Sequence, residues 1–208
     1  MYRPPLYRVV DASFFVPFIR ANPFGLLVSP DGESPIAATH VPFVWQSGPT
    51  PYGQLVGHLA RANPQARSLG GSRVLVVFQG PHAYISPAWY GAAEAVPTWD
   101  YQAVHATGTA TLMEGAELTQ VLRDAIRFFD PDLPLADQLQ QPFYQDYQKA
   151  VVGFRVDVEQ IQGQSKLSQN RTPAERLGVM AGLRVRGGVF DGMMADLIGA
   201  TLPPETKN

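Results

Sequence analysis

The chain contains no cysteine, which excludes disulfide bonds, thiolate metal ligands and cysteine nucleophiles. Charged residues are also scarce, at 16% of the 208 residues, and the formal net charge is −2. No run of Lys or Arg exceeds two residues. A dominant electrostatic attraction to nucleic acid is therefore not expected, and the charge pattern does not support a DNA partner or a regulatory protein partner.

Long apolar segments are missing as well. No apolar stretch approaches the length of a membrane-spanning helix, and the first 25 residues lack the pattern of a secretion signal. We therefore expect a cytoplasmic protein without a membrane partner. The GxGxxG, Walker, HExxH and GxSxG motifs are also absent.

The four histidines stand far apart in the sequence: His40, His58, His82 and His105. Two of them could meet in space, but no acidic or second-histidine spacing supports a metal site. No metal is therefore predicted, and no catalytic residue is assigned.

Apolar residues and proline are plentiful. A hydrophobic content of 45% supports a sizeable core, and nineteen prolines mark turns between many short elements. Strands are expected at 24–29, 36–45, 54–59, 73–79, 83–86, 101–113 and 153–161. Helices are expected at 11–20 with Asp11 as a possible N-cap, and at 62–69, 117–129 and 143–151. This order predicts one domain over 1–208, mainly β with α additions, an N-terminal helix and a helical C-terminal extension over about 170–208.

Polar and aromatic residues interrupt the apolar strands. Thr39 and His40 lie inside one strand, and a second strand ends with His58, Arg61 and Asn63. A flat ligand with an anionic tail needs such donors and acceptors at its ring edge, and an Arg near a helix start for its phosphate. The same residues also fit a simple turn that Asn63 caps, with Arg61 in solvent.

Five segments resemble the PaiB-type FMN-binding negative transcriptional regulator family, in the order that the family shows. They are ATHVPF (38–43), GHLARANPQ (57–65), FQGPHAYISPAWY (78–90), VPTW (96–99) and GQSKLSQN (163–170). One departure is Asp100, where the resemblance implies Asn. An acceptor-only carboxylate at this position changes the contacts that the side chain can make.

The resemblance implies an antiparallel split β-barrel, as in pyridoxamine-phosphate oxidase and flavin reductases. It also implies a homodimer with FMN in a cleft at the subunit interface. Arg61 is then expected at the phosphate, His58 and Asn63 at the phosphate or ribityl chain, and Thr39 and His40 at the ring edge. Two further groups are expected at the site: Lys166, Ser168, Gln169 and Asn170, which close it from the partner subunit, and Trp89, Tyr90 and Trp99, which cover the ring or pack the dimer core.

Three functions stay open at this point. The first is an FMN-dependent regulator or sensor, although no helix-turn-helix motif is legible. The second is an FMN oxidoreductase that takes electrons from NADH or NADPH. The third is a haem-binding split barrel with one histidine on the iron. Any redox chemistry belongs to the flavin itself, so no catalytic triad is expected.

Overall fold

The computed structural model describes residues 1–30, 36–92 and 94–203, and these form two compact units. The barrel unit comprises Ser13–Phe78 and Val104–Gln162. The terminal unit comprises Met1–Ala12, Gln79–Ala103 and the chain from Gly163 onward. A single domain over 1–208 stays a prediction.

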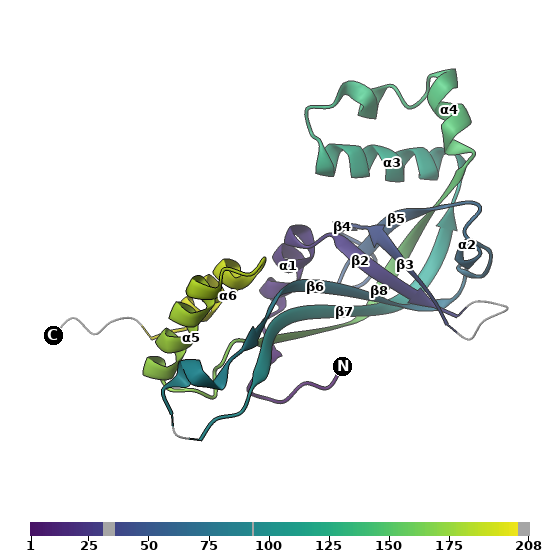
Figure 1. The fold of residues 1–208 in the computed structure, drawn as a ribbon. Helices are drawn as coiled ribbons and strands as arrows, with labels where there is room; N and C mark the ends of the chain where they lie inside the picture. The colour runs from purple at the N-terminus through teal and green to yellow at the C-terminus, as the bar shows by residue number, and fades with distance from the viewer. Residues whose placement is uncertain (31–35, 93, 204–208) are drawn as a thin grey trace. The chain divides into compact units, whose positions relative to one another are not determined.

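One sheet of eight strands organises the chain, in the order β3-β2-β6-β7-β8-β5-β4, with β1 added on β8 (Figure 1). The pairs with a described register are antiparallel. The strands are β1 (Arg8–Val9), β2 (Phe24–Ser29), β3 (Ala37–Pro42), β4 (Val44–Gln46), β5 (Gln54–Ala60), β6 (Arg73–Ile85), β7 (Thr98–Met113) and β8 (Val151–Lys166). Because β6, β7 and β8 are long, each contributes residues to both units.

The barrel unit owes its curvature to the two outermost strands. β3 and β4 stand at opposite ends of the sheet order, yet only Phe43 separates them in the chain. The sheet therefore curls back on itself around a core of aromatic rings. Phe43 meets Phe78 and Phe154 edge to face, with ring centroids 5.5 and 5.9 Å apart, and all three side chains are buried. This is the predicted antiparallel fold of split-barrel type.

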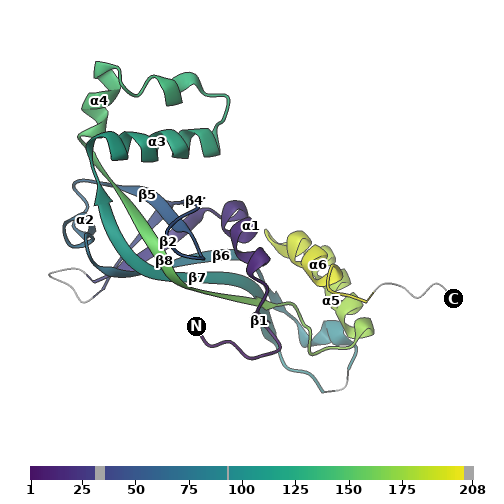
Figure 2. The same ribbon diagram turned by 180° about the vertical axis from the view of Figure 1, so that it is seen from behind.

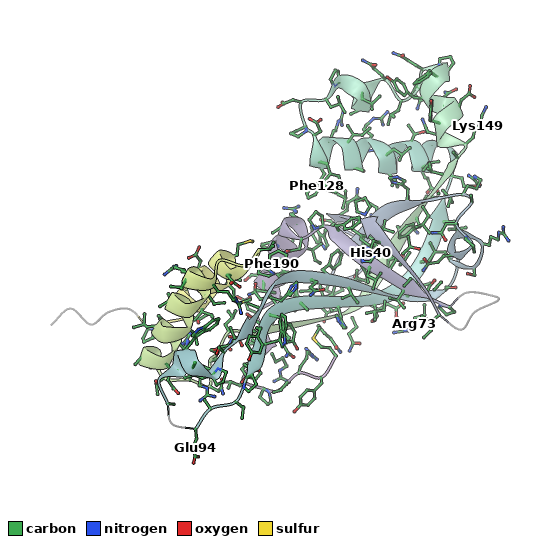
Figure 3. All side chains as sticks on the ribbon, in the orientation of Figure 1. His40, Arg73, Glu94, Phe128, Lys149 and Phe190 are labelled. Carbon is green, nitrogen blue, oxygen red and sulfur yellow. The ribbon has the colours of Figure 1, made fainter. Side chains whose placement is uncertain are left out.

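Helices cover parts of the barrel unit. They are η1 (Ala12–Phe14, which begins at the boundary), α1 (Phe15–Ala21), α2 (Gln65–Ser68), α3 (Gly115–Phe129), η3 (Pro134–Asp137) and α4 (Pro142–Gln148). The amphipathic α3 packs Val121 against Val44 and Val56, and Phe128 points toward the same strands (Figure 3). Figure 2 shows from behind how β8 leads away from the α3–α4 segment.

The terminal unit has its own core. Here α5 (Pro173–Arg186) and α6 (Asp191–Gly199) pack side by side, as both ribbon views show, and α5 also contacts η2 (Pro87–Tyr90). Leu183, Met194 and Ile198 are fully buried in this cluster. A capping box between Thr172 and Glu175 starts α5, which satisfies the free N–H groups of its first turn.

Most predicted elements are present, and the differences have physical reasons. The segments 73–79 and 83–86 form one strand, β6. Proline cannot donate a backbone hydrogen bond, but Pro81 lies outside Leu75–Val77, the part of β6 that pairs with β2, so it does not interrupt that pairing. The predicted strand 36–45 divides at Phe43, where the chain turns between β3 and β4. The predicted helix 11–20 forms as η1 followed directly by α1, and no side chain caps α1, which Phe14 precedes. A cap by Asp11 at the start of η1 stays a prediction.

Candidate functional site

Two of the predicted site residues meet in a polar cluster of the barrel unit. The Thr39 hydroxyl donates to Gln65 Oε1 at 2.6 Å and accepts from Asn63 Nδ2 at 3.0 Å. Asn63 Oδ1 in turn accepts from the backbone N–H of Gln65, which begins α2. Gln65 is buried, and its Nε2 donates to Ser29 Oγ at 2.8 Å. The cluster therefore ties α2 to β2 and β3, and Thr39 already has two partners within the chain.

Arg61 lies at the end of β5 and turns toward β8 and α3. Its Nε donates to the carbonyl of Lys149 at 3.0 Å, and its Nη2 donates to the carbonyl of Val151 at 3.0 Å. Its Nη1 forms an ion pair with Glu114 at 2.9 Å, and half of the Arg61 side chain stays exposed. A guanidinium group has five N–H donors, so these three bonds leave donors free for a ligand.

A cavity of about 430 Å³ opens beside Arg61, within the size range of ligand pockets. Its walls come from Arg61, the first turn of α3, and the polar face of α4 with Gln145, Gln148 and Lys149. No side chain caps the start of α3. Unpaired N–H groups at a helix start favour an anion there, and the guanidinium adds to this preference.

The two histidines predicted for the site lie on different strands. His40 on β3 is exposed and stacks on Phe24 at a centroid distance of 5.6 Å. His58 on β5 pairs with Gly153 of β8, and burial lowers the pKa of its imidazole. His58 is therefore expected to be neutral, with a ring nitrogen that can accept a hydrogen bond.

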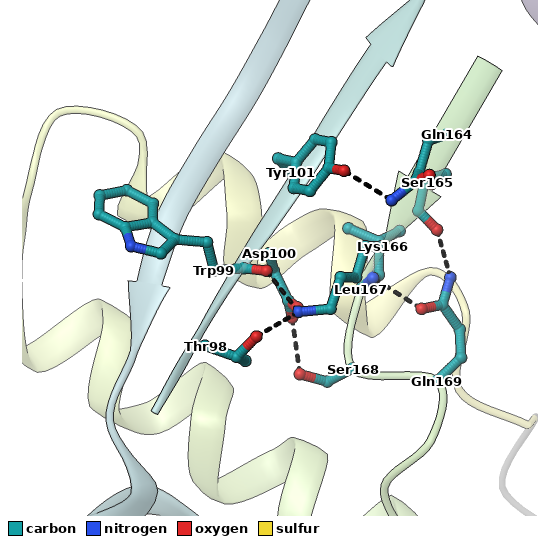
Figure 4. A network of polar contacts seen from close by, with 10 residues as sticks. All are labelled: Thr98, Trp99, Asp100, Tyr101, Gln164, Ser165, Lys166, Leu167, Ser168 and Gln169. Carbon is teal, nitrogen blue, oxygen red and sulfur yellow. Dashed lines mark hydrogen bonds and ion pairs between the residues drawn. The ribbon is translucent and has the colours of Figure 1, made fainter. Parts of the chain in front are cut away.

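A second polar network belongs to the terminal unit (Figure 4). Asp100 of β7 is fully buried, accepts from Ser168 Oγ at 2.6 Å and lies 3.6 Å from Lys166 Nζ. Lys166 also donates to the carbonyl of Trp99 at 2.6 Å and to the hydroxyl of Thr98.

The same network extends along the turn after β8. The Gln169 side chain donates to the carbonyl of Ser165 at 2.6 Å and accepts from the N–H of Leu167 at 2.7 Å. Asn170, at the end of the turn, is exposed. Of the residues predicted to close the site, the structure thus brings Lys166 and Ser168 together on Asp100, whereas Gln169 stabilises the turn and Asn170 faces solvent.

Burial raises the pKa of the Asp100 carboxyl, and the Ser168 hydroxyl and the Lys166 ammonium offset only part of this effect. A buried acid of this kind binds its proton more tightly in the folded state than in the unfolded state. Its contribution to the free energy of unfolding is therefore largest below its ordinary pKa of 3.8 and declines as the pH rises through the raised value.

Asp100→Asn removes this titration. The stability of the wild type relative to Asp100→Asn is therefore expected to decline as the pH rises above the ordinary carboxyl pKa of 3.8. Urea unfolding of both proteins over a series of pH values measures the difference. A difference that grows with pH would contradict the raised pKa.

The three predicted aromatic residues have different surroundings. Trp89 packs on α5 where Gly178 and Gly182 leave room, and the Arg186 guanidinium lies 5.0 Å from its ring centroid. Tyr90 is buried, with the Arg171 guanidinium 4.0 Å from its ring. Only Trp99 offers a broad free face, because 54% of it is exposed.

Two residues beside Trp99 were not predicted for the site. His82 and Tyr84 each lie with their ring 6.2 Å from the Trp99 ring, and Phe190, labelled in Figure 3, lies 4.8 Å from His82. The alternation of His82 and Tyr84 along β6 is the sequence signal that could have indicated them, because both point to the same face. Gln65 was missed too, although it ends the second motif.

Taken separately, each unit offers side chains that suit one part of FMN, the barrel unit its amide, imidazole and guanidinium groups and the terminal unit its indole. An exposed indole face suits a flat ring system, neutral imidazole and amide groups suit hydroxyl or ring-edge contacts, and a half-exposed guanidinium with spare donors suits a phosphate. The described residues contain no group of three or more His, Asp and Glu side chains that could hold a metal ion. In the part of the chain that the structure describes, no helix has the length and apolarity needed to cross a membrane.

Comparison with known proteins agrees with this reading. Residues 1–160 match the family FMN_bind_2, described as "Putative FMN-binding domain". The Bacillus subtilis "Protease synthase and sporulation protein PAI 2" is 39% identical over 202 residues, which cover 95% of this chain and 96% of that protein.

Two solved structures share the fold at low sequence identity. The flavocytochrome Anf3 from Azotobacter vinelandii has a TM-score of 0.62 at 14% identity, over 80% of this chain and 72% of that one. The FAD and heme binding protein from Mycobacterium smegmatis has a TM-score of 0.60 at 13% identity, over 77% and 73%. By its motifs, its family match and its Bacillus relative, the chain belongs to the PaiB-type FMN-binding family, with FMN as its cofactor.

Proposed function

We propose that this chain is a flavin-dependent regulator: a homodimer that holds FMN at its subunit interface and whose bound flavin controls association with a partner. The observation that carries the FMN site is Arg61. Its guanidinium borders a cavity of about 430 Å³, is half exposed, and keeps donors free beyond its three bonds within the chain.

In this proposal the barrel unit holds the phosphate and the ribityl chain. Arg61 donates to the phosphate, which also benefits from the uncapped start of α3. His58 and Asn63 contact the ribityl hydroxyls or the phosphate. Thr39 and His40 lie at the ring edge, and Thr39 exchanges one of its present partners for the flavin.

The terminal unit of the partner subunit supplies the ring cover. Trp99 stacks on the flavin, and the residues from Lys166 to Asn170 close the site. Trp89 and Tyr90 act through packing, since both are engaged with α5 or its preceding turn. When bound, FMN supplies a reversible redox centre, and the chain's own residues bind it, orient it and exclude water from one face.

The regulatory role is supported by the resemblance to the PaiB-type negative transcriptional regulator family, with the Bacillus subtilis "Protease synthase and sporulation protein PAI 2" as a relative at 39% identity. Direct recognition of duplex DNA is not part of the proposal, because the chain has a net charge of −2. The alternative function is an FMN oxidoreductase that accepts electrons from NADH or NADPH.

The homodimer is supported by large apolar side chains that one chain leaves exposed. They include Phe24, Phe143, Tyr147, Val185 and Val189. Of these, Phe143 and Tyr147 lie together on α4, with ring centroids 4.9 Å apart, and contiguous exposed apolar area commonly marks an interface. An obligate dimer would bury more than about 2,000 Å² in total.

One experiment on the purified protein tests this function. The protein should show flavin absorption bands, or gain them on titration with FMN, and light scattering should give twice the mass of one chain. Under anaerobic NADH or NADPH the bands should persist. Rapid bleaching would instead favour the oxidoreductase, a Soret band would favour haem, and a monomer that still binds FMN would overturn the interface site.

A further inference from the structure

The turn from Lys166 to Asn170 has an unusual backbone. Ser168 has a φ of +57° and is the one non-glycine residue with positive φ among those that the structure describes. The left-handed conformation is unfavourable for any residue with a Cβ atom, so surrounding contacts must hold it. Ser168 is also buried, which means that its hydroxyl needs a partner inside the protein.

Asp100 supplies that partner from β7. Its Oδ2 accepts the Ser168 hydroxyl at 2.6 Å, while its Oδ1 lies 3.6 Å from the ammonium of Lys166, two residues earlier. One fully buried carboxylate therefore attracts both the start and the middle of the turn. Figure 4 shows both contacts converging on Asp100.

The chemistry of these contacts calls for a carboxylate. Ser168 donates a hydroxyl hydrogen and Lys166 carries only donors, so both need an acceptor. An Asn side chain would offer one acceptor oxygen and would turn an amide donor toward one of the two groups. Among the described residues, the Gln169 side chain bonds to Ser165 and Leu167, both within its own segment. The side-chain contacts that attach this turn to β7 are therefore those of Asp100 and the bonds of Lys166 to Thr98 and Trp99.

We propose that Asp100 is a positioning residue: it holds Ser168 in its left-handed conformation and Lys166 against β7, and so presents Gln169 and Asn170 to the flavin. This inference rests on the proposed function, in which the turn closes the FMN site. Asp100 itself does not touch the flavin. It acts through the geometry of the turn.

Two measurements on the full chain test this inference separately from the function. Hydrogen exchange of the flavin-free protein reports the order of the turn, and fluorescence titration reports FMN affinity. Asp100→Ala should raise exchange over residues 164–171 by about tenfold or more, because the turn opens locally. It should also weaken FMN by about tenfold, since misplaced contact groups lose affinity.

Two further variants control for effects on folding. Ser168→Ala removes the hydroxyl but leaves Asp100 in place, and it should loosen the same turn even if Asp100→Ala fails to fold. Asp191→Ala removes another buried carboxylate of the terminal unit, one that binds Arg186 and the N–H of Gly188. It should raise exchange near 186–191 and leave both the turn and FMN affinity unchanged.

The outcomes are distinct. Unchanged exchange over 164–171 in both Asp100→Ala and Ser168→Ala overturns the inference. Increased exchange with unchanged FMN affinity supports the positioning role and contradicts the proposed place of the turn in the flavin site. Increased exchange in Asp191→Ala over the same turn shows general loosening of the unit and also overturns the inference.

Discussion

Gly182→Ala should lower the free energy of unfolding by about 1–3 kcal/mol, the usual cost of overpacking. A Cβ atom at residue 182 would lie well inside 3.0 Å of the Trp89 ring, closer than real Cβ contacts. The ring cannot retreat easily, because the backbone carbonyl of Trp89 also touches the Cβ position of Gly178. The better helix propensity of Ala offsets at most about 1 kcal/mol of this cost.

Gly192→Ala is the matched control. Gly192 lies in α6, where an added Cβ would meet no atom within 4 Å. The same substitution should therefore leave stability unchanged or raise it by up to about 1 kcal/mol. Urea unfolding followed by tryptophan fluorescence compares the variants. If Gly182→Ala is as stable as Gly192→Ala, the packing of Trp89 on α5 is not as described.

The fold was predictable where the local pattern and the tertiary structure agree. β2 spans 24–29 as predicted, and the apolar spacing within 117–129 predicts most of α3. The continuity of β6 was not predictable, because Gly80 and Pro81 form a typical turn signal. Whether a strand runs through a proline depends on its pairing partner, which the local sequence does not reveal.

The sequence names the candidate site residues, which stay a prediction, but it does not indicate their partners within the chain. Thr39 and Asn63 bond to each other directly and share Gln65 as a partner, whose bonds depend on how α2 packs. Arg61 bonds to carbonyl groups about ninety positions away in the chain. Such long-range contacts follow from the pairing of β5 with β8, and no motif around Arg61 indicates them.

Arg61→Ala is expected to weaken FMN binding by about 10- to 150-fold. Hydrogen bonds to a charged group contribute about 1.5–3 kcal/mol, and the phosphate is a dianion that a guanidinium meets through its planar fork. Arg61→Lys should recover only part of the loss, because a point charge replaces the fork. Arg61 also donates to two backbone carbonyls, so its loss can lower the stability of the fold. The free energy of unfolding of each variant is therefore measured together with its FMN affinity.

Glu114→Gln is the matched variant, and it should change FMN affinity in the opposite direction to Arg61→Ala. Glu114 is the acidic partner of Arg61 and lies in the wall of the same cavity. The Glu114 carboxylate competes with the phosphate for the guanidinium, and its negative charge repels the phosphate. Removing an exposed charge of this kind is worth about 0.2–1 kcal/mol, so FMN should bind about 1.5- to 5-fold more tightly.

The ratio of FMN to riboflavin affinity in the wild type and in Arg61→Ala tests the central claim most directly. Riboflavin has the same ring and ribityl chain but lacks the phosphate, so loss of a phosphate contact leaves its affinity almost unchanged. Fluorescence quenching titrations of both flavins should show a wild-type preference for FMN that shrinks by about the factor lost for FMN, 10- to 150-fold. Equal losses for both flavins, or no loss for either, would contradict a phosphate site at Arg61.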